Sequence, residues 1–67
     1  MRNGSVKKDY VEVFGIRKPV FVVTLRDDDV CDTQYYPDAD IAQKTVDQFE
    51  QGNYTVDVDG NVEINQL

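Results

Sequence analysis

The sequence has no histidine and no tryptophan, and its 67 residues include one cysteine, Cys31. Histidine is the commonest general base, so its absence excludes a Ser/His/Asp triad and a Cys/His nucleophile pair. A lone cysteine cannot form an internal disulfide, and without histidine it cannot complete an ordinary zinc site. Asp29 and Asp32 lie beside Cys31 in the sequence, and their charge makes it a poor nucleophile. A domain of this size without tryptophan also offers little concavity for a substrate. We therefore expect no enzymatic activity, no cofactor and no specific metal site.

Long apolar runs are also missing. No stretch of 18 apolar residues occurs, and the first eight residues contain no apolar run. The sequence thus predicts neither a membrane span nor a secretion signal, and we expect a cytoplasmic protein. At this length the chain can form one domain, residues 1–67, and can bury only about 60% of the surface that the unfolded chain exposes.

Charge is divided along the chain. Residues 1–26 carry six basic and two acidic side chains, a net charge of +4, whereas residues 27–67 carry Lys44 and eleven acidic side chains, a net charge of −10. The two parts give the overall −6. An acidic surface disfavours direct binding to nucleic acid and favours a partner protein with a basic surface.

Two apolar segments in the first half predict paired strands. Residues 10–14 are β-branched or aromatic apart from Glu12, and they are followed by Gly15, which indicates a strand ending in a turn. Residues 20–25 form the most apolar hexamer and predict a central strand. We expect residues 1–8 to be a flexible basic arm, residues 15–19 a connection, and the aspartate-rich residues 27–36 a loop.

The second half predicts a helix and a hairpin. Asp38 is a favoured N-cap after Pro37, Gly52 is a C-terminal stop, and Ala42, Thr45, Val46 and Phe49 share one helical face. Residues 54–64 alternate between apolar and polar side chains around the turn signal Asp59-Gly60. A three-residue loop over residues 59–61, left-handed at Asn61, would pair Val58 with Val62 and Val56 with Ile64. The expected fold is α+β: a small antiparallel sheet in the order β-β-α-β-β with one amphipathic helix packed on one face.

One face of the predicted sheet has no evident cover. We assign to it Val20, Val22 and Thr24, together with Tyr10 and Phe14. An alternative function that would use this face is that of a structural or assembly module, which dimerises or docks through it. We expect the chain to be a monomer or a weak homodimer. Solvent exposure of these side chains explains the pattern equally well.

The acidic residues supply the candidate site. If the loop and the wet face of the helix share one side, they form a negative strip that could dock on a lysine- and arginine-lined groove. Two tyrosines beside it are aromatic anchors of the kind enriched at interfaces. The candidate partner-binding residues are Asp27, Asp28, Asp29, Asp32, Tyr35, Tyr36, Asp38, Asp40 and Asp47. A further alternative is weak binding of a divalent cation by the aspartates of residues 27–32, although aspartates are also common in solvated loops.

In size, acidity, lack of histidine and compact α+β plan, the chain resembles small phage-encoded inhibitors, including anti-CRISPR proteins and other nucleic-acid mimics. The resemblance covers the whole chain, and no motif assigns a residue through it. It implies a non-enzymatic protein that blocks the nucleic-acid-binding surface of a host defence or transcription complex and acts in the host cytoplasm. The basic first 26 residues differ from those of a pure mimic.

Overall fold

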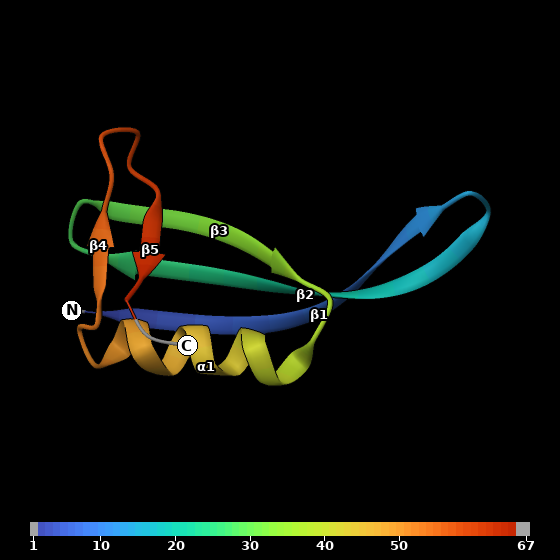
Figure 1. Cartoon of the computed structure of the whole chain (residues 1–67), viewed down its shortest axis with the longest axis horizontal. Helices are drawn as coiled ribbons and strands as arrows, with labels where there is room; N and C mark the ends of the chain where they lie inside the picture. The colour runs from blue at the N-terminus through green and yellow to red at the C-terminus, as the bar shows by residue number, and fades with distance from the viewer. Residues whose placement is uncertain (1, 66–67) are drawn as a thin grey trace.

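A computed structural model describes residues 2–65. Its elements are β1 (Asn3–Val13), β2 (Ile16–Asp27), β3 (Val30–Tyr36), α1 (Ala39–Glu50), β4 (Tyr54–Val56) and β5 (Val62–Ile64). The first three strands form an antiparallel sheet in the order β1-β2-β3, and β4 pairs with β5 in a separate sheet (Figure 1). The predicted α+β class, with a helix packed on an antiparallel sheet, is confirmed, and the observed order β-β-β-α-β-β contains one strand more than predicted. Met1 and residues 66–67 of the predicted domain lie outside the described residues.

Helix α1 forms as its sequence predicts. The Asp38 carboxylate accepts hydrogen bonds from the backbone N–H groups of Asp40 at 2.7 Å and Ile41 at 3.3 Å, as an N-cap does. The predicted inner face is confirmed, and its buried residues are Ala42, Thr45, Val46 and Phe49. This face packs against Val23 and Leu25 of β2 in a small apolar core. No helix in the described part of the chain is long and apolar enough to cross a membrane.

Gly4 lets α1 approach β1 closely. A Cβ atom built on Gly4 would lie 2.9 Å from Cγ1 of Val46, which is closer than side-chain atoms pack. Residues 3–8 are a strand, so the prediction that they belong to a flexible basic arm was wrong. They pair with β2 from Asn3–Arg26 to Lys8–Phe21 and pack against the helix. The sequence does not show the apolar alternation of a strand here because glycine occupies one of the inward positions.

The β4–β5 hairpin covers the same side of the three-stranded sheet as α1 and leaves the other side open (Figure 1). Val62 of β5 is buried against the core, and the ring of Tyr54 lies 4.4 Å from that of Phe49, centroid to centroid. Paired residues of an antiparallel sheet share a face. Tyr10 pairs with Pro19 and lies on the helix side, so its assignment to the open face was wrong, whereas Val20, Val22 and Thr24 are on the open face.

Residues 27–36 are not a loop. Strand β2 continues to Asp27, a tight turn follows at Asp28 and Asp29, and β3 begins at Val30. Two of the four inward positions of β3 carry polar side chains, Asp32 and Gln34, so the strand shows no apolar alternation in the sequence. Both side chains are satisfied by hydrogen bonds to β5, which is why they are tolerated on the covered face.

The connection between the first two strands is two residues long, not five. Phe14 and Gly15 have φ angles of 51° and 76°, which suit a two-residue hairpin turn with both central residues left-handed. Since β3 pairs with β2 only from Phe21 onward, residues 9–20 form a two-stranded projection beyond the core, which we call the β-finger (Figure 1). The molecule is consequently elongated, with dimensions of 38 × 23 × 18 Å.

The final hairpin has the predicted loop length in a different register. Val56 pairs with Val62 and Tyr54 with Ile64, two residues away from the predicted pairing, and the N–H of Asp57 bonds to the carbonyl of Asn61. The three loop residues are therefore 58–60, and the left-handed one is Gly60, at φ 86°, in place of Asn61. Glycine takes this conformation at less cost than asparagine. The shift leaves Val58 fully exposed.

Candidate functional site

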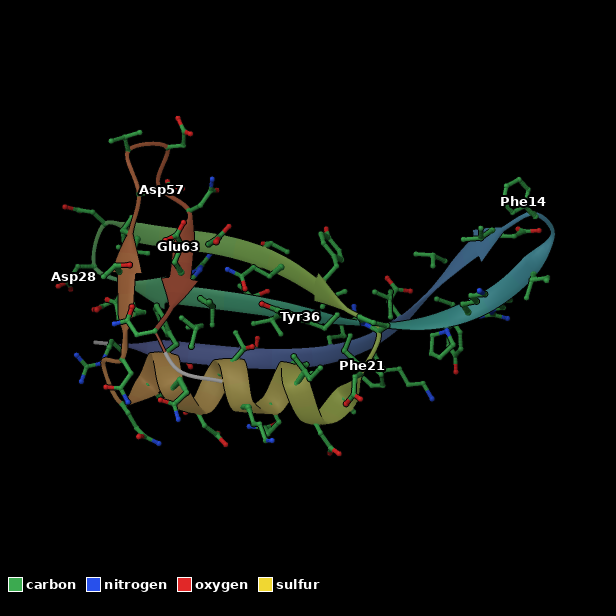
Figure 2. All side chains as sticks on the ribbon, viewed as in Figure 1. Phe14, Phe21, Asp28, Tyr36, Asp57 and Glu63 are labelled. Carbon is green, nitrogen blue, oxygen red and sulfur yellow. The ribbon has the colours of Figure 1, made fainter. Side chains whose placement is uncertain are left out.

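Carboxylates from two separate hairpins gather at the end of the molecule opposite the β-finger. We call this surface the acidic end, and its residues are Asp28 and Asp29 of the β2–β3 turn together with Asp57, Asp59 and Glu63 of the β4–β5 hairpin. In Figure 2, Asp28, Asp57 and Glu63 lie at one end of the protein and Phe14 at the other. Arg26 of β2 and Arg2, both from the basic first part of the chain, also lie at this end, so the division of charge along the sequence is only partly kept in space.

The β4–β5 loop that carries part of the acidic end is organised by Asp57. Its carboxylate accepts hydrogen bonds of 2.9 Å from the N–H groups of Asn61 and Asp59, and a longer one of 3.4 Å from the Asn61 side chain. The bond from the Asn61 N–H is the main reason that the pKa of Asp57 is lowered, because it favours the charged form. Asp57 therefore stays ionised and orders the loop that presents Asp59.

Two of the predicted site residues serve the fold. The Tyr54 hydroxyl donates a hydrogen bond to the carboxylate of Asp27, which is partly buried at the end of β2. This bond, followed by burial and by the negative charge of Asp27, raises the pKa of Tyr54. Asp32 points inward and accepts hydrogen bonds of 2.9 Å from the N–H of Val62 and from Nε2 of Gln34. Both aspartates hold the final hairpin against the sheet.

The two predicted tyrosine anchors face opposite sides of the sheet. Tyr35 pairs with Val22 on the open face and is 66% exposed. Tyr36 points inward, packs against the core and donates its hydroxyl proton to Gln34. Only Tyr35 presents its ring to solvent, and both tyrosines lie at the end of β3 away from Asp28 and Asp29, so the prediction of aromatic anchors beside the acidic residues was wrong.

The predicted residues at the start of the helix lie apart from the acidic end. Asp38 and Asp40 sit where α1 begins, near the base of the β-finger, and the seven-residue strand β3 separates them from Asp29 by roughly 20 Å (Figure 1). Asp47 is on the exposed side of the helix and accepts a 3.0 Å hydrogen bond from Nε2 of Gln43. The structure thus brings Asp28 and Asp29 together with carboxylates of the last hairpin, leaves Asp38 and Asp40 near the β-finger, and directs Asp47 to the outer side of the helix.

Sequence reasoning did not include Asp57, Asp59 and Glu63 in the site. Their hairpin was predicted from Asp59-Gly60, but its position beside the β2–β3 turn depends on bonds such as Asp32 to Val62, which join residues 30 positions apart. A pairing of that kind leaves no local pattern. The signal available in the sequence was the total charge of residues 27–67, and it did not show which carboxylates would be neighbours.

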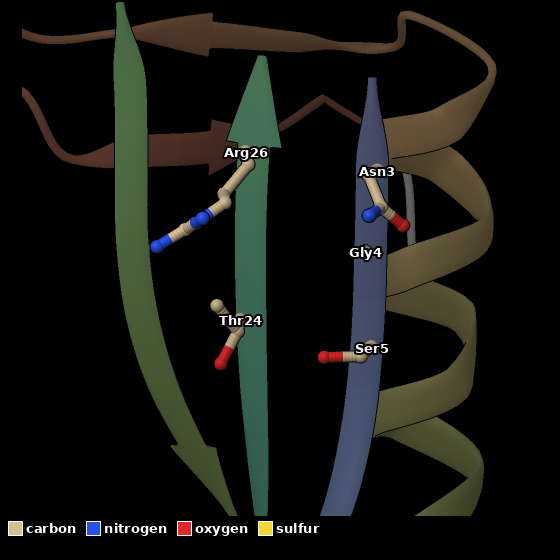
Figure 3. A pocket seen from close by; sticks show the side chains of 5 residues that line it. All are labelled: Asn3, Gly4, Ser5, Thr24 and Arg26. Atoms are coloured by element: carbon tan, nitrogen blue, oxygen red, sulfur yellow. The ribbon is translucent and has the colours of Figure 1, made fainter. Parts of the chain in front are cut away.

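The open face of the sheet contains a polar hollow of about 250 Å³. Its lining residues are Asn3, Gly4, Ser5, Thr24 and Arg26 (Figure 3). Hydroxyl, amide and guanidinium groups can form hydrogen bonds but do not act as a general base at neutral pH. Within residues 2–65, no group of three or more potential ligands is placed to hold a metal ion. Nothing in the described part of the chain therefore favours the cation-binding alternative.

Comparison with known proteins found no matching family model, no similar curated protein and no similar solved structure. The function is therefore argued from the surfaces of the molecule.

Proposed function

We propose that this chain is a non-enzymatic inhibitor whose acidic end occupies a basic, nucleic-acid-binding site on a partner protein, such as a component of a CRISPR-type defence complex in the cytoplasm of a phage host. The observation that carries the proposal is that exposed carboxylates of two hairpins, which are distant in the sequence, gather at one end of the molecule (Figure 2). The net charge of −6 extends the attraction beyond direct contacts.

Charge complementarity supports this kind of partner. A duplex carries one negative charge per about 1.7 Å of its axis, so a protein groove that binds it is lined with lysine and arginine. Carboxylates gathered at one end of the molecule would present the same sign of charge to that groove and would also increase the rate of encounter. Gathering like charges opposes folding, and the hydrogen bonds made by Asp32 and Asp57 offset that cost.

The proposal is tested by reversing charge at the acidic end. Asp29→Lys with Glu63→Lys changes one residue in each hairpin, and both side chains are exposed, so the fold should be retained. Asp27 is unsuitable for this purpose because Tyr54 donates a hydrogen bond to it. The matched control is Asp40→Lys with Asp47→Lys, which produces the same change in net charge on the helix. Affinity for a partner captured from host lysate, and then purified, is measured for each protein.

We expect the acidic-end pair to weaken binding more than tenfold and the helix pair to have a small effect. Equal losses for the two pairs would mean that the partner responds to net charge alone. Unchanged binding by the acidic-end pair would reject the acidic end as the contact surface.

A second candidate function, an assembly module, is favoured by the open sheet face. Its apolar side chains run from the β-finger to β3, and the most exposed are Ile16 at 59% and Tyr35 at 66%. Exposed apolar patches on small proteins commonly mark contact sites. If this face mediates a symmetric dimer, Tyr35→Ser should shift the molecular mass measured by sedimentation from dimer to monomer. A mass unaffected by this change would remove the candidate.

A further inference from the structure

Phe14 at the tip of the β-finger is fully exposed and has a left-handed backbone. Two-residue hairpin turns of this conformation favour asparagine, aspartate or glycine at the first position, and a bulky side chain there is strained. A side chain with 100% exposure gains nothing from the core in return. Strain that is not needed for the fold points to a contact made with another molecule.

The surroundings of Phe14 extend this contact surface. Val13 and Ile16 flank the turn as a pair and are 41% and 59% exposed. Farther from the tip, on the opposite face of the hairpin, the Arg17 guanidinium lies 4.3 Å from the centre of the Tyr10 ring, and the Lys8 ammonium lies 5.5 Å from it. The β-finger and the two lysines at its base have four basic and two acidic residues, a net charge of +2. The surface that would receive it must therefore be apolar with carboxylates around it.

The acidic end has that chemistry. Val58 is fully exposed between Asp57 and Asp59, and Val56 is 41% exposed. Apolar contact and charge are thus both complementary between the β-finger and the acidic end. Within one molecule these surfaces lie at opposite ends of a 38 Å long body, so a single copy cannot bring them together (Figure 2).

We propose that the β-finger of one copy docks on the acidic end of a second copy. Such a contact joins two different surfaces, so it either repeats head to tail in an open chain or closes, in a ring or in an antiparallel pair that uses both contacts. A finger tip buries little area, so the association should be weak and should be seen at high protein concentration. This inference does not rest on the proposed inhibitory function, although a basic partner and a second copy would compete for the acidic end.

Two variants separate the two surfaces. Phe14→Asn removes the aromatic ring and creates Asn-Gly, the favoured sequence for this turn, so the hairpin should be as stable as before or more stable. Val58→Ser with Asp59→Lys removes the apolar side chain of the acidic end and reverses one of its charges, at two exposed positions. Sedimentation velocity up to millimolar concentration measures the mass of each protein, and circular dichroism confirms that each is folded.

Wild-type chains should form concentration-dependent oligomers, and each variant alone should be monomeric. Mixed in equal amounts, the variants should form a heterodimer that grows no further, because one supplies an intact finger and the other an intact acidic end. A monomeric wild type overturns the proposal. So does association that survives Phe14→Asn, or a mixture without heterodimer, since these results indicate a symmetric contact through the sheet face. Binding of a basic partner by Phe14→Asn is scored separately, so a failure here leaves the inhibitory function testable.

Discussion

The Asp32 carboxylate in β3 accepts a hydrogen bond of 2.9 Å from the backbone N–H of Val62 in β5, and Gln34 donates to both the Asp32 carboxylate and the Val62 carbonyl. This side-chain clamp joins the two sheets where no strand pairing does. Asp32→Ala would leave the Val62 N–H without its acceptor in a partly buried position. We expect a loss of about 2 kcal/mol in the free energy of unfolding, measured by urea titration.

Asp29→Ala is the control for that loss. Asp29 is an exposed turn residue, and its substitution should change the free energy of unfolding by less than about 0.5 kcal/mol. If Asp32→Ala is as mild as Asp29→Ala, Asp32 does not hold the hairpin.

The hydrogen bond from Tyr54 to Asp27 makes stability depend on alkaline pH. The pKa of Tyr54 is raised in the folded protein, first by this bond, so the folded state holds the phenol proton more tightly than the unfolded state does. The resulting stabilisation is complete below the unfolded pKa of about 10 and is lost as the pH rises through the folded pKa. Tyr54→Phe should cost about 1 to 2 kcal/mol at pH 7, and the difference from wild type should narrow above pH 10.

Urea titrations of both proteins at neutral and alkaline pH measure that difference. Tyr35→Phe, with its ring exposed, should change stability at pH 7 by less than about 0.5 kcal/mol. A Tyr54→Phe difference that stays constant or widens above pH 10 would contradict the assigned bond.

Asp57 gives the opposite pH dependence. Its pKa lies below the ordinary 3.8, mainly because the N–H of Asn61 donates to its carboxylate. A lowered pKa stabilises the loop above the unfolded pKa, and that stabilisation is lost as the pH falls through the folded value. Amide NMR shifts of Asp59 and Asn61 should therefore titrate with a midpoint below 3.8, and Asp57→Asn should abolish that titration. A midpoint at or above 3.8 would show that the bonds do not form in solution.

The N-cap at Asp38 should matter for the helix and not for binding. Asp38→Ala leaves two backbone N–H groups without their acceptor and should cost about 1 kcal/mol of stability. Asp38→Asn, which keeps a capping oxygen, should restore most of it. Affinity for the captured partner should be similar in all three proteins, and a loss of affinity in Asp38→Asn would place the helix start within the contact surface.

Local patterns predicted the helix better than the sheet. The inner face of α1 follows from a period of 3.6 residues, and Asp38 is a cap whatever packs around it. The sequence did not predict strand β3 because its inward side chains Asp32 and Gln34 are polar. These side chains can face the core only because they bond to Val62 of β5, nearly 30 residues farther along the chain. The first strand was predicted too short because residues 3–8 are polar apart from Gly4 and Val6.

The sequence predicted that the candidate site is acidic, but it did not predict which residues form it. Negative residues 27–29 were recognised, yet sequence could not show that Asp27 would bond to Tyr54 or that the β4–β5 loop would lie beside the turn. Similarly, Phe14-Gly15 predicts the end of a strand, but the length of the β-finger depends on the pairing of Asp9 with Val20 and of Val13 with Ile16.

Competition with DNA tests most directly whether the acidic end occupies a nucleic-acid-binding site. A labelled duplex is bound to the purified partner, and fluorescence anisotropy follows its release as the chain is added. We expect complete displacement by the wild type, with the apparent Kd for DNA rising in proportion to chain concentration, and at least tenfold weaker displacement by Asp29→Lys with Glu63→Lys. A ternary complex, in which the chain binds while the duplex remains bound, would contradict the proposed function.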